Sequence, residues 1–95
     1  MKVLVVGAGA REHALAAALL AHGDCDVVCA PGNPGIALDV PVRALDASDP
    51  DAVLALAVAE AVDLTVIGPE APLAAGVADR FAAAGRPLFG PTRAA

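Results

Sequence analysis

Four short segments of the sequence combine glycine with proline or a charged residue: 7–11, 31–35, 68–73 and 90–92. Glycine lets backbone N–H groups approach a ligand closely, because no Cβ stands in the way. Loops of this kind suit a small anionic molecule that carries a phosphate or a carboxylate. The four segments therefore predict a ligand site, provided that the fold brings them together.

Three charged residues in or directly after these segments are candidates for ligand contact. Arg11 falls at or next to a predicted helix N-terminus, where the helix dipole favours anions, so it is either a solvated surface residue or a contact to a phosphate or carboxylate. Glu12 complements the same dipole with or without a ligand. Glu70 follows Gly68-Pro69 at the end of a buried strand, and this place favours ligand contact over capping of the next helix.

Other polar residues have structural explanations. His13 is expected to be packed and hydrogen-bonded, Asn33 to form a turn, and Asp49 to cap a helix. Cys25 and Cys29 would lie about 13 Å apart on one face of a strand, too far for a disulfide. We interpret both as buried thiols, with zinc or redox chemistry as the alternative.

The elements that must position these segments alternate along the chain. β-branched runs bounded by glycine or proline predict strands, and alanine-rich stretches with caps predict helices. The expected strands are 2–6, 26–30, 40–45, 64–67 and 87–89. The first expected helix covers 11–22 and ends at Gly23, a left-handed cap. The second runs from Pro50 to Val62 or Asp63 and directs three residues inward: Leu54, Val58 and Ala61. The third runs from near Ala71 to Gly85 and likewise directs three inward: Leu73, Val77 and Phe81.

This alternation predicts an α/β fold, a Rossmann-like open parallel sheet with helices on both faces. Ligands of such sheets bind outside the carboxyl ends of the strands. In the usual strand order 2–6 and 64–67 are neighbours, so the segments that follow them should flank the binding crevice.

Several function classes do not suit this sequence. The dinucleotide fingerprint needs a third glycine where Glu12 stands and an acid where the second strand ends in Cys29-Ala30-Pro31. A formal charge of −5 and only two aromatic residues argue against nucleic acid. The apolar runs are too short for a membrane span, so we expect a cytoplasmic protein without a membrane partner.

Four motifs together resemble those of glycinamide ribonucleotide synthetases, also called phosphoribosylamine–glycine ligases. They are GAGAREHA at Gly7–Ala14, APGNPG at Ala30–Gly35, GPEAPL at Gly68–Leu73 and FGPT at Phe89–Thr92. The resemblance covers all 95 residues. REHA and GPEAPL are specific to this family, whereas FGPT would also suit other ATP-grasp enzymes.

The resemblance implies an enzyme of purine biosynthesis that uses ATP to activate glycine as an acyl phosphate, which the amine of 5-phosphoribosylamine attacks. It implies that residues 1–90 form the N-terminal, pre-ATP-grasp domain and that 91–95 begin the connection to an absent ATP-grasp domain. The partners would be both substrates together with the missing ATP-grasp and C-terminal domains. ATP and its Mg²⁺ or Mn²⁺ would bind outside this segment, which alone should be inactive.

The resemblance also assigns substrate-binding residues, with no catalytic acid or base and no metal ligand among them. Those expected to line the phosphoribosylamine pocket are Gly7, Gly9, Arg11, Glu12, Asn33, Gly35, Gly68, Pro69, Glu70 and Pro72. Ala10 departs from the family pattern, which has glycine there, and a positive φ at Ala10 would strain the turn by about 1 kcal/mol. The alternatives are a stand-alone Rossmann-like binding module and a nicotinamide-dependent dehydrogenase domain.

Overall fold

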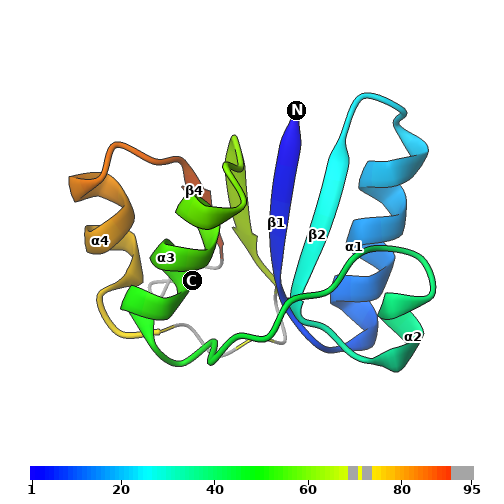
Figure 1. Cartoon of the computed structure of the whole chain (residues 1–95), viewed down its shortest axis with the longest axis horizontal. Coiled ribbons are helices and arrows are strands. Elements are labelled where there is room, and N and C mark those ends of the chain that lie inside the picture. Colours follow the sequence, from blue (N-terminus) through cyan, green and yellow to red (C-terminus); the bar gives the residue numbers. More distant parts are fainter. Residues whose placement is uncertain (69–70, 72–73, 91–95) are drawn as a thin grey trace.

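In the computed structural model of the protein, which describes residues 1–68, 71 and 74–90, one parallel sheet runs through the molecule (Figure 1). Its strands are β1 (Lys2–Gly7), β2 (Asp26–Pro31), β3 (Leu64–Ile67) and β4 (Leu88–Phe89), in the order β2-β1-β3-β4. The helices are α1 (Ala10–Ala21), α2 (Pro34–Ala37), α3 (Pro50–Ala59) and α4 (Val77–Ala83). The predicted α/β class is confirmed, and β1 and β3 are neighbours as expected.

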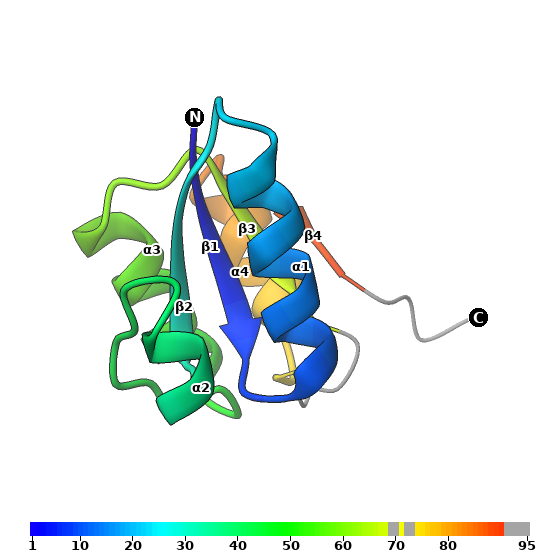
Figure 2. The ribbon, with the colours of Figure 1, turned by 90° about the vertical axis from the view of Figure 1, so that its right-hand side faces the viewer.

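Helices cover both faces of the sheet, as Figures 1 and 2 show. On one face α1 and α2 pack against β1 and β2, with Val5, Ala16 and Ile36 completely buried. On the other face α3 and α4 pack against β1 and β3, around Leu4 and Phe81. Among the described residues, no helix has the length and hydropathy to cross a bilayer.

The strand expected at 40–45 is reduced to a single bridge. Val42 pairs in parallel with Cys29 of β2, through bonds from the Cys29 N–H to the Pro41 carbonyl (3.0 Å) and from the Arg43 N–H to the Cys29 carbonyl (3.0 Å). Pro41 has no N–H with which to continue the ladder, so pairing stops there. The sequence prediction of a full strand was wrong.

Local capping chemistry sets the helix ends. Gly23 adopts φ 84° after α1, and the Asp49 carboxylate accepts bonds from the first turn of α3, both as predicted. Helix α3 ends at Ala59, earlier than expected, because Ala61 turns left-handed (φ 53°) and the Val62 N–H bonds back to the Ala57 carbonyl (3.2 Å). This 6→1 bond closes a Schellman motif that normally has glycine at its left-handed position.

Two predictions need correction, the inward face of α3 and the start of α4. The buried residues of α3 are Val53 and Ala57, and Val58 is 49% exposed, so the expected inward stripe was wrong at Val58, although Leu54 packs against the core as predicted. Helix α4 begins at Val77, well after the expected start near Ala71, because Gly76 adopts a left-handed backbone (φ 81°) immediately before it. Val77 and Phe81 are buried as predicted, and Leu73 lies outside the described residues.

Candidate functional site

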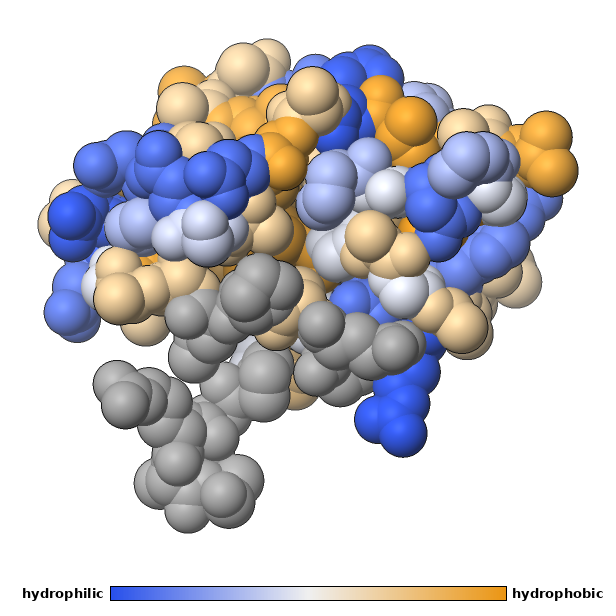
Figure 3. Space-filling view, turned by 90° about the horizontal axis from the view of Figure 1, so that it is seen from below, coloured by the Kyte–Doolittle hydropathy of each residue, from blue (hydrophilic) through white to orange (hydrophobic). Residues whose placement is uncertain are grey.

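The carboxyl ends of β1 and β3 lie side by side at the lower edge in Figure 1. β1 ends at Gly7, and the Gly68 N–H, just beyond β3, donates to the Val6 carbonyl (2.8 Å). Gly90 also reaches this edge, since a Cβ added there would lie 3.1 Å from the Cβ of Ile67. Figure 3 views the molecule from this side, where polar and near-neutral residues cover much of the coloured surface.

Glu12, in the first turn of α1, is completely buried between Gly7 and Gly68. A Cβ added to either glycine would lie 2.6 Å from the carboxyl carbon of Glu12, well inside van der Waals contact. The two glycines therefore provide the space that the Glu12 side chain fills. Sequence reasoning placed Glu12 on the helix dipole and in the pocket lining, but it missed this packing between the two turns.

The second glycine segment is bound directly to the first. The Gly32 N–H donates to the Gly7 carbonyl (3.0 Å), and the Asn33 side chain donates through Nδ2 to the Ala8 carbonyl (2.6 Å). The Asn33 Oδ1 accepts a bond from the Ile36 N–H (2.9 Å) and so caps α2. Asn33 thus forms the turn that the sequence predicts and joins it to the glycine-rich turn.

Gly35 has a steric role in this arrangement. A Cβ at Gly35 would lie 3.2 Å from Asn33 Oδ1, closer than nine in ten real Cβ contacts. Its backbone is helical within α2, so steric space and not an unusual φ explains the glycine. Gly35 leaves the Asn33 carboxamide room for its two hydrogen bonds.

His13 links α1 to the segment that follows α2. Its Nε2 lies 2.5 Å from Oδ2 of Asp39. The expectation of a hydrogen-bonded histidine is confirmed, although His13 is about one-third exposed. Together with Asn33, this contact fastens residues 32–40 against the start of α1.

The two cysteines are free thiols, as the sequence predicts, but only Cys29 is buried; the prediction of a buried thiol was wrong for Cys25, which is partly exposed. Its Sγ donates to the Gly7 carbonyl (3.5 Å). Burial, with a smaller contribution from the negative charge of Glu12, raises the pKa of the Cys29 thiol. A buried thiol that resists ionisation is poorly suited to nucleophilic or redox chemistry.

Arg11 is exposed in the first turn of α1, next to the buried Glu12. Gly9 is the N-cap residue in extended conformation (φ −94°), and Ala10 begins the helix with an ordinary negative φ. The replacement of glycine by Ala10 therefore introduces no backbone strain. Arg11 lies in the helix turn that directly follows the glycine-rich turn at the carboxyl end of β1.

The structure brings most of the predicted site residues to one edge of the sheet. Those on the segments that meet there are Gly7, Gly9, Arg11, Glu12, Asn33, Gly35 and Gly68. Pro69, Glu70 and Pro72 lie outside the described residues. No group of three His, Cys, Asp or Glu side chains that could hold a metal ion occurs in the described part of the chain.

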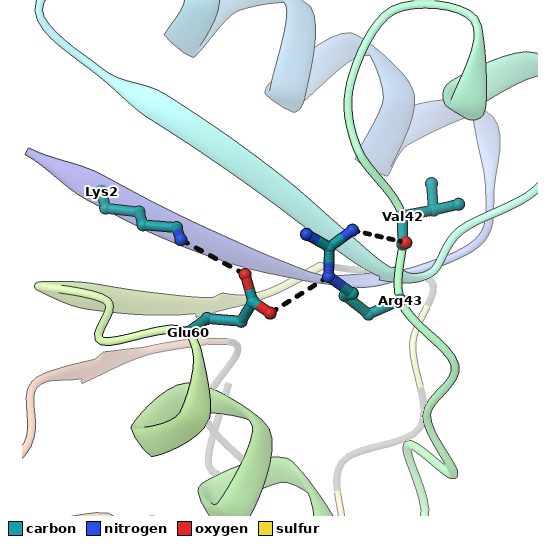
Figure 4. Close-up of polar contacts among 4 residues, drawn as sticks. All are labelled: Lys2, Val42, Arg43 and Glu60. Carbon is teal, nitrogen blue, oxygen red and sulfur yellow. Dashed lines mark hydrogen bonds and ion pairs between the residues drawn. The ribbon is translucent and has the colours of Figure 1, made fainter.

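A separate polar cluster lies toward the amino ends of the strands (Figure 4). The Glu60 carboxylate accepts from the Lys2 ammonium (3.2 Å) and from the Arg43 Nε (3.0 Å). These two hydrogen bonds lower the pKa of the Glu60 carboxyl group, and the bond from Arg43 contributes most. All three residues line a groove of about 320 Å³, and their charges are directed at one another.

Comparison with known proteins gives a consistent result. The family described as phosphoribosylglycinamide synthetase, N domain, matches residues 1–95. Proteins named phosphoribosylamine–glycine ligase are 57% identical in Leifsonia xyli subsp. xyli and 54% identical in Ralstonia nicotianae, each over the whole of this chain and 23% of the relative. A third, from Streptomyces coelicolor, is 54% identical over 97% of this chain and 22% of its own length. The chain thus spans less than a quarter of the relatives that it matches.

Proposed function

The chain belongs to the family of phosphoribosylglycinamide synthetase N domains, and from that premise we propose that it forms the N-terminal substrate-binding domain of a phosphoribosylamine–glycine ligase. Such a ligase joins 5-phosphoribosylamine and glycine with ATP, and releases glycinamide ribonucleotide, ADP and phosphate. The remaining domains would be the chain's partners. The proposed location in the cytoplasm and the domain boundary at residue 90 stay predictions.

One observation supports the proposal beyond the family match. The glycine-containing segments after β1, β2 and β3 converge on one edge of the sheet, with Glu12 buried between Gly7 and Gly68. Parallel α/β sheets bind ligands at this edge. The same segments carry the motifs by which the family is recognised.

The residues at this edge suggest distinct roles toward phosphoribosylamine. The exposed Arg11 guanidinium suits an anionic sugar phosphate, to which it can make paired, charge-assisted hydrogen bonds. We propose that Gly9 allows the ligand to approach the backbone, and that Gly7 and Gly68, which leave room for the Glu12 side chain, line the pocket through their backbone atoms. Because Glu12 is completely buried, we propose that it acts on the ligand through the glycines beside it.

We also propose that three residues of the third glycine segment contact the ligand, Pro69, Glu70 and Pro72. This assignment rests on their sequence motif alone. We propose that Asn33 and Gly35 lie beside these lining residues and support the pocket. The contribution of all these residues is to orient the amine nucleophile and its sugar phosphate, which accelerates the reaction by proximity. We assign no proton transfer to the described residues.

ATP supplies the activation of glycine in the proposed reaction, with Mg²⁺ or Mn²⁺ as its counterion. On the family resemblance alone, we propose that ATP and its metal ion bind outside this segment. The role of this chain is therefore to hold the acceptor substrate while the rest of the enzyme handles the phosphoryl group.

The proposal can be tested with a chimeric ligase in which this chain replaces the matching N-terminal segment of the Leifsonia relative. We expect ADP release that requires both glycine and phosphoribosylamine, as in the unaltered relative. A chimeric ligase that is monodisperse and binds ATP, yet releases no ADP in response to phosphoribosylamine, would contradict the proposal. Micromolar binding of NADH by the chain would instead favour the dehydrogenase alternative.

A further inference from the structure

Asn33 lies at the contact between the second glycine segment and the glycine-rich turn. Its side chain uses both polar atoms: Nδ2 donates to the Ala8 carbonyl (2.6 Å) and Oδ1 accepts from the Ile36 N–H (2.9 Å). The contact joins residues that are 25 positions apart in the sequence. Since both atoms have protein partners, Asn33 is already engaged before any ligand is present.

Two successive carbonyls of the glycine-rich turn are fixed by this contact. The Gly7 carbonyl accepts from the Gly32 N–H (3.0 Å) and the Ala8 carbonyl from Asn33. In a planar trans peptide, the carbonyl of one residue and the N–H of the next point in opposite directions. The N–H groups of Ala8 and Gly9 are therefore directed away from residues 32–33.

We infer that Asn33 is a positioning residue, which orients the Ala8–Gly9 peptide of the glycine-rich turn for phosphoribosylamine instead of contacting the substrate itself. This inference rests on the proposed function. The capping bond to Ile36 holds the carboxamide in one orientation, and Gly35 leaves it the necessary space. A glycine-rich turn has wide conformational freedom, so a side chain that fixes its carbonyls also fixes the N–H groups that meet the ligand.

The test uses Asn33→Ser in the chimeric ligase. Serine is a good N-cap and is uncharged, so it can keep the bond to the Ile36 N–H, but it is too short to maintain the bond to Ala8. Asp49→Ser is the matched control, because Asp49 caps α3 in the same way without touching the turn. The measurements are hydrogen exchange of peptides that cover residues 5–12 without ligand, and KM for each substrate.

For Asn33→Ser we expect faster exchange over residues 5–12 and a KM for phosphoribosylamine raised about tenfold, since small misplacements at a reactive site have large effects. KM for ATP and glycine should stay unchanged, and Asp49→Ser should change neither measurement. A raised KM with unchanged exchange would overturn the inference, because it indicates direct substrate contact. Faster exchange without a change in KM would also overturn it.

The two proposals fail in different ways. If the chimeric ligase shows no phosphoribosylamine-dependent ADP release, the proposed function fails whatever Asn33 does. If that activity is present but Asn33→Ser leaves the KM for phosphoribosylamine unchanged, only the positioning role is contradicted.

Discussion

The two ends of the parallel sheet are stabilised in different ways. At the carboxyl end the turns contact one another through backbone carbonyls and through Glu12, which lies between two glycines. At the amino end charged side chains make the contacts: Glu60 pairs with Lys2 and Arg43, and the Lys2 N–H donates to the Asp63 carboxylate (2.8 Å). The difference indicates that shape matters at the carboxyl end, whereas the amino end depends on partly exposed charges that each contribute little.

The largest effect is expected from one methyl group added at the carboxyl end of the sheet. Gly68→Ala would place a Cβ 2.6 Å from the carboxyl carbon of Glu12, and the buried Glu12 has little room to move. We expect the free energy of unfolding to fall by about 1–3 kcal/mol, as for other overpacked sites. Urea denaturation of the chain measures this change.

A double-mutant cycle identifies the cause. In a Glu12→Ala background the added methyl group no longer meets the Glu12 carboxylate arm, so Gly68→Ala should cost much less there. Gly35→Ala is the control, because its Cβ would lie 3.2 Å from Asn33 Oδ1 and within 4 Å of no atom of Glu12, so its cost should be the same with and without Glu12. An equal loss of stability with and without Glu12 would show that packing against Glu12 is not the reason for the glycine.

Removal of one arginine at each end of the sheet should show that only the carboxyl end binds substrate. Arg11→Ala in the chimeric ligase should raise KM for phosphoribosylamine about 10-fold to 100-fold, the equivalent of a lost charged hydrogen bond. KM for ATP should change much less. Arg86→Ala is the matched control, since Arg86 bonds to the Val62 carbonyl (3.3 Å) at the amino end.

Steady-state kinetics with each substrate varied in turn measures these constants. If Arg11→Ala raised the KM for ATP as much as that for phosphoribosylamine, the assignment of Arg11 to the sugar phosphate would be wrong.

Much of the fold and part of the site could be predicted because their signals are local. Asp49 precedes a proline at a helix start, and Gly23 follows a run of helix formers, so both caps are visible in the sequence. The meeting of Gly7 and Gly68 also follows from sequence, since parallel strands place their carboxyl ends at one edge. These inferences need only periodicity, caps and the parallel fold.

Other features depend on distances that a single sequence does not contain. The burial of Glu12 arises only because two glycines from separate strands leave a space of its size. The pairing of Glu60 with Lys2 and Arg43 likewise joins residues 58 and 17 positions away. The bond from Asn33 to Ala8 could not be predicted either, although the glycine segments 7–11 and 31–35 were both expected at the carboxyl ends of strands.

A smaller effect is expected where α3 ends, at the amino end. Ala61 has φ 53°, and the equivalent position after α4 is Gly85 with φ 68°. Ala61→Gly should raise the free energy of unfolding by about 0.5–1 kcal/mol, because left-handed backbone is unfavourable for alanine. Gly85→Ala should lower it by a similar amount.

Thermal and urea unfolding of both variants check this pair. The test is strict because the effect of glycine on the unfolded chain alone would give the reverse signs, with Ala61→Gly destabilising and Gly85→Ala stabilising. Destabilisation by Ala61→Gly would contradict the expected strain at Ala61.

The smallest effect on stability is expected for Glu60→Gln, at the amino end of the sheet. Hydrogen bonds from Arg43 and Lys2 lower the pKa of Glu60 in the folded chain, so ionised Glu60 stabilises the fold above its ordinary pKa. That contribution is lost as the pH falls through the lowered value. The difference in stability between the chain and Glu60→Gln should therefore be present at pH 7 and disappear in acid.

Unfolding midpoints measured from pH 7 down to pH 3, at low and at high salt, test this prediction. High salt should shrink the difference at pH 7, because these charges are partly exposed and screened. A difference that persisted unchanged in acid would show that Glu60 acts through packing instead of charge. The amino end would then resemble the carboxyl end, and the distinction between shape at one end and charge at the other would no longer hold.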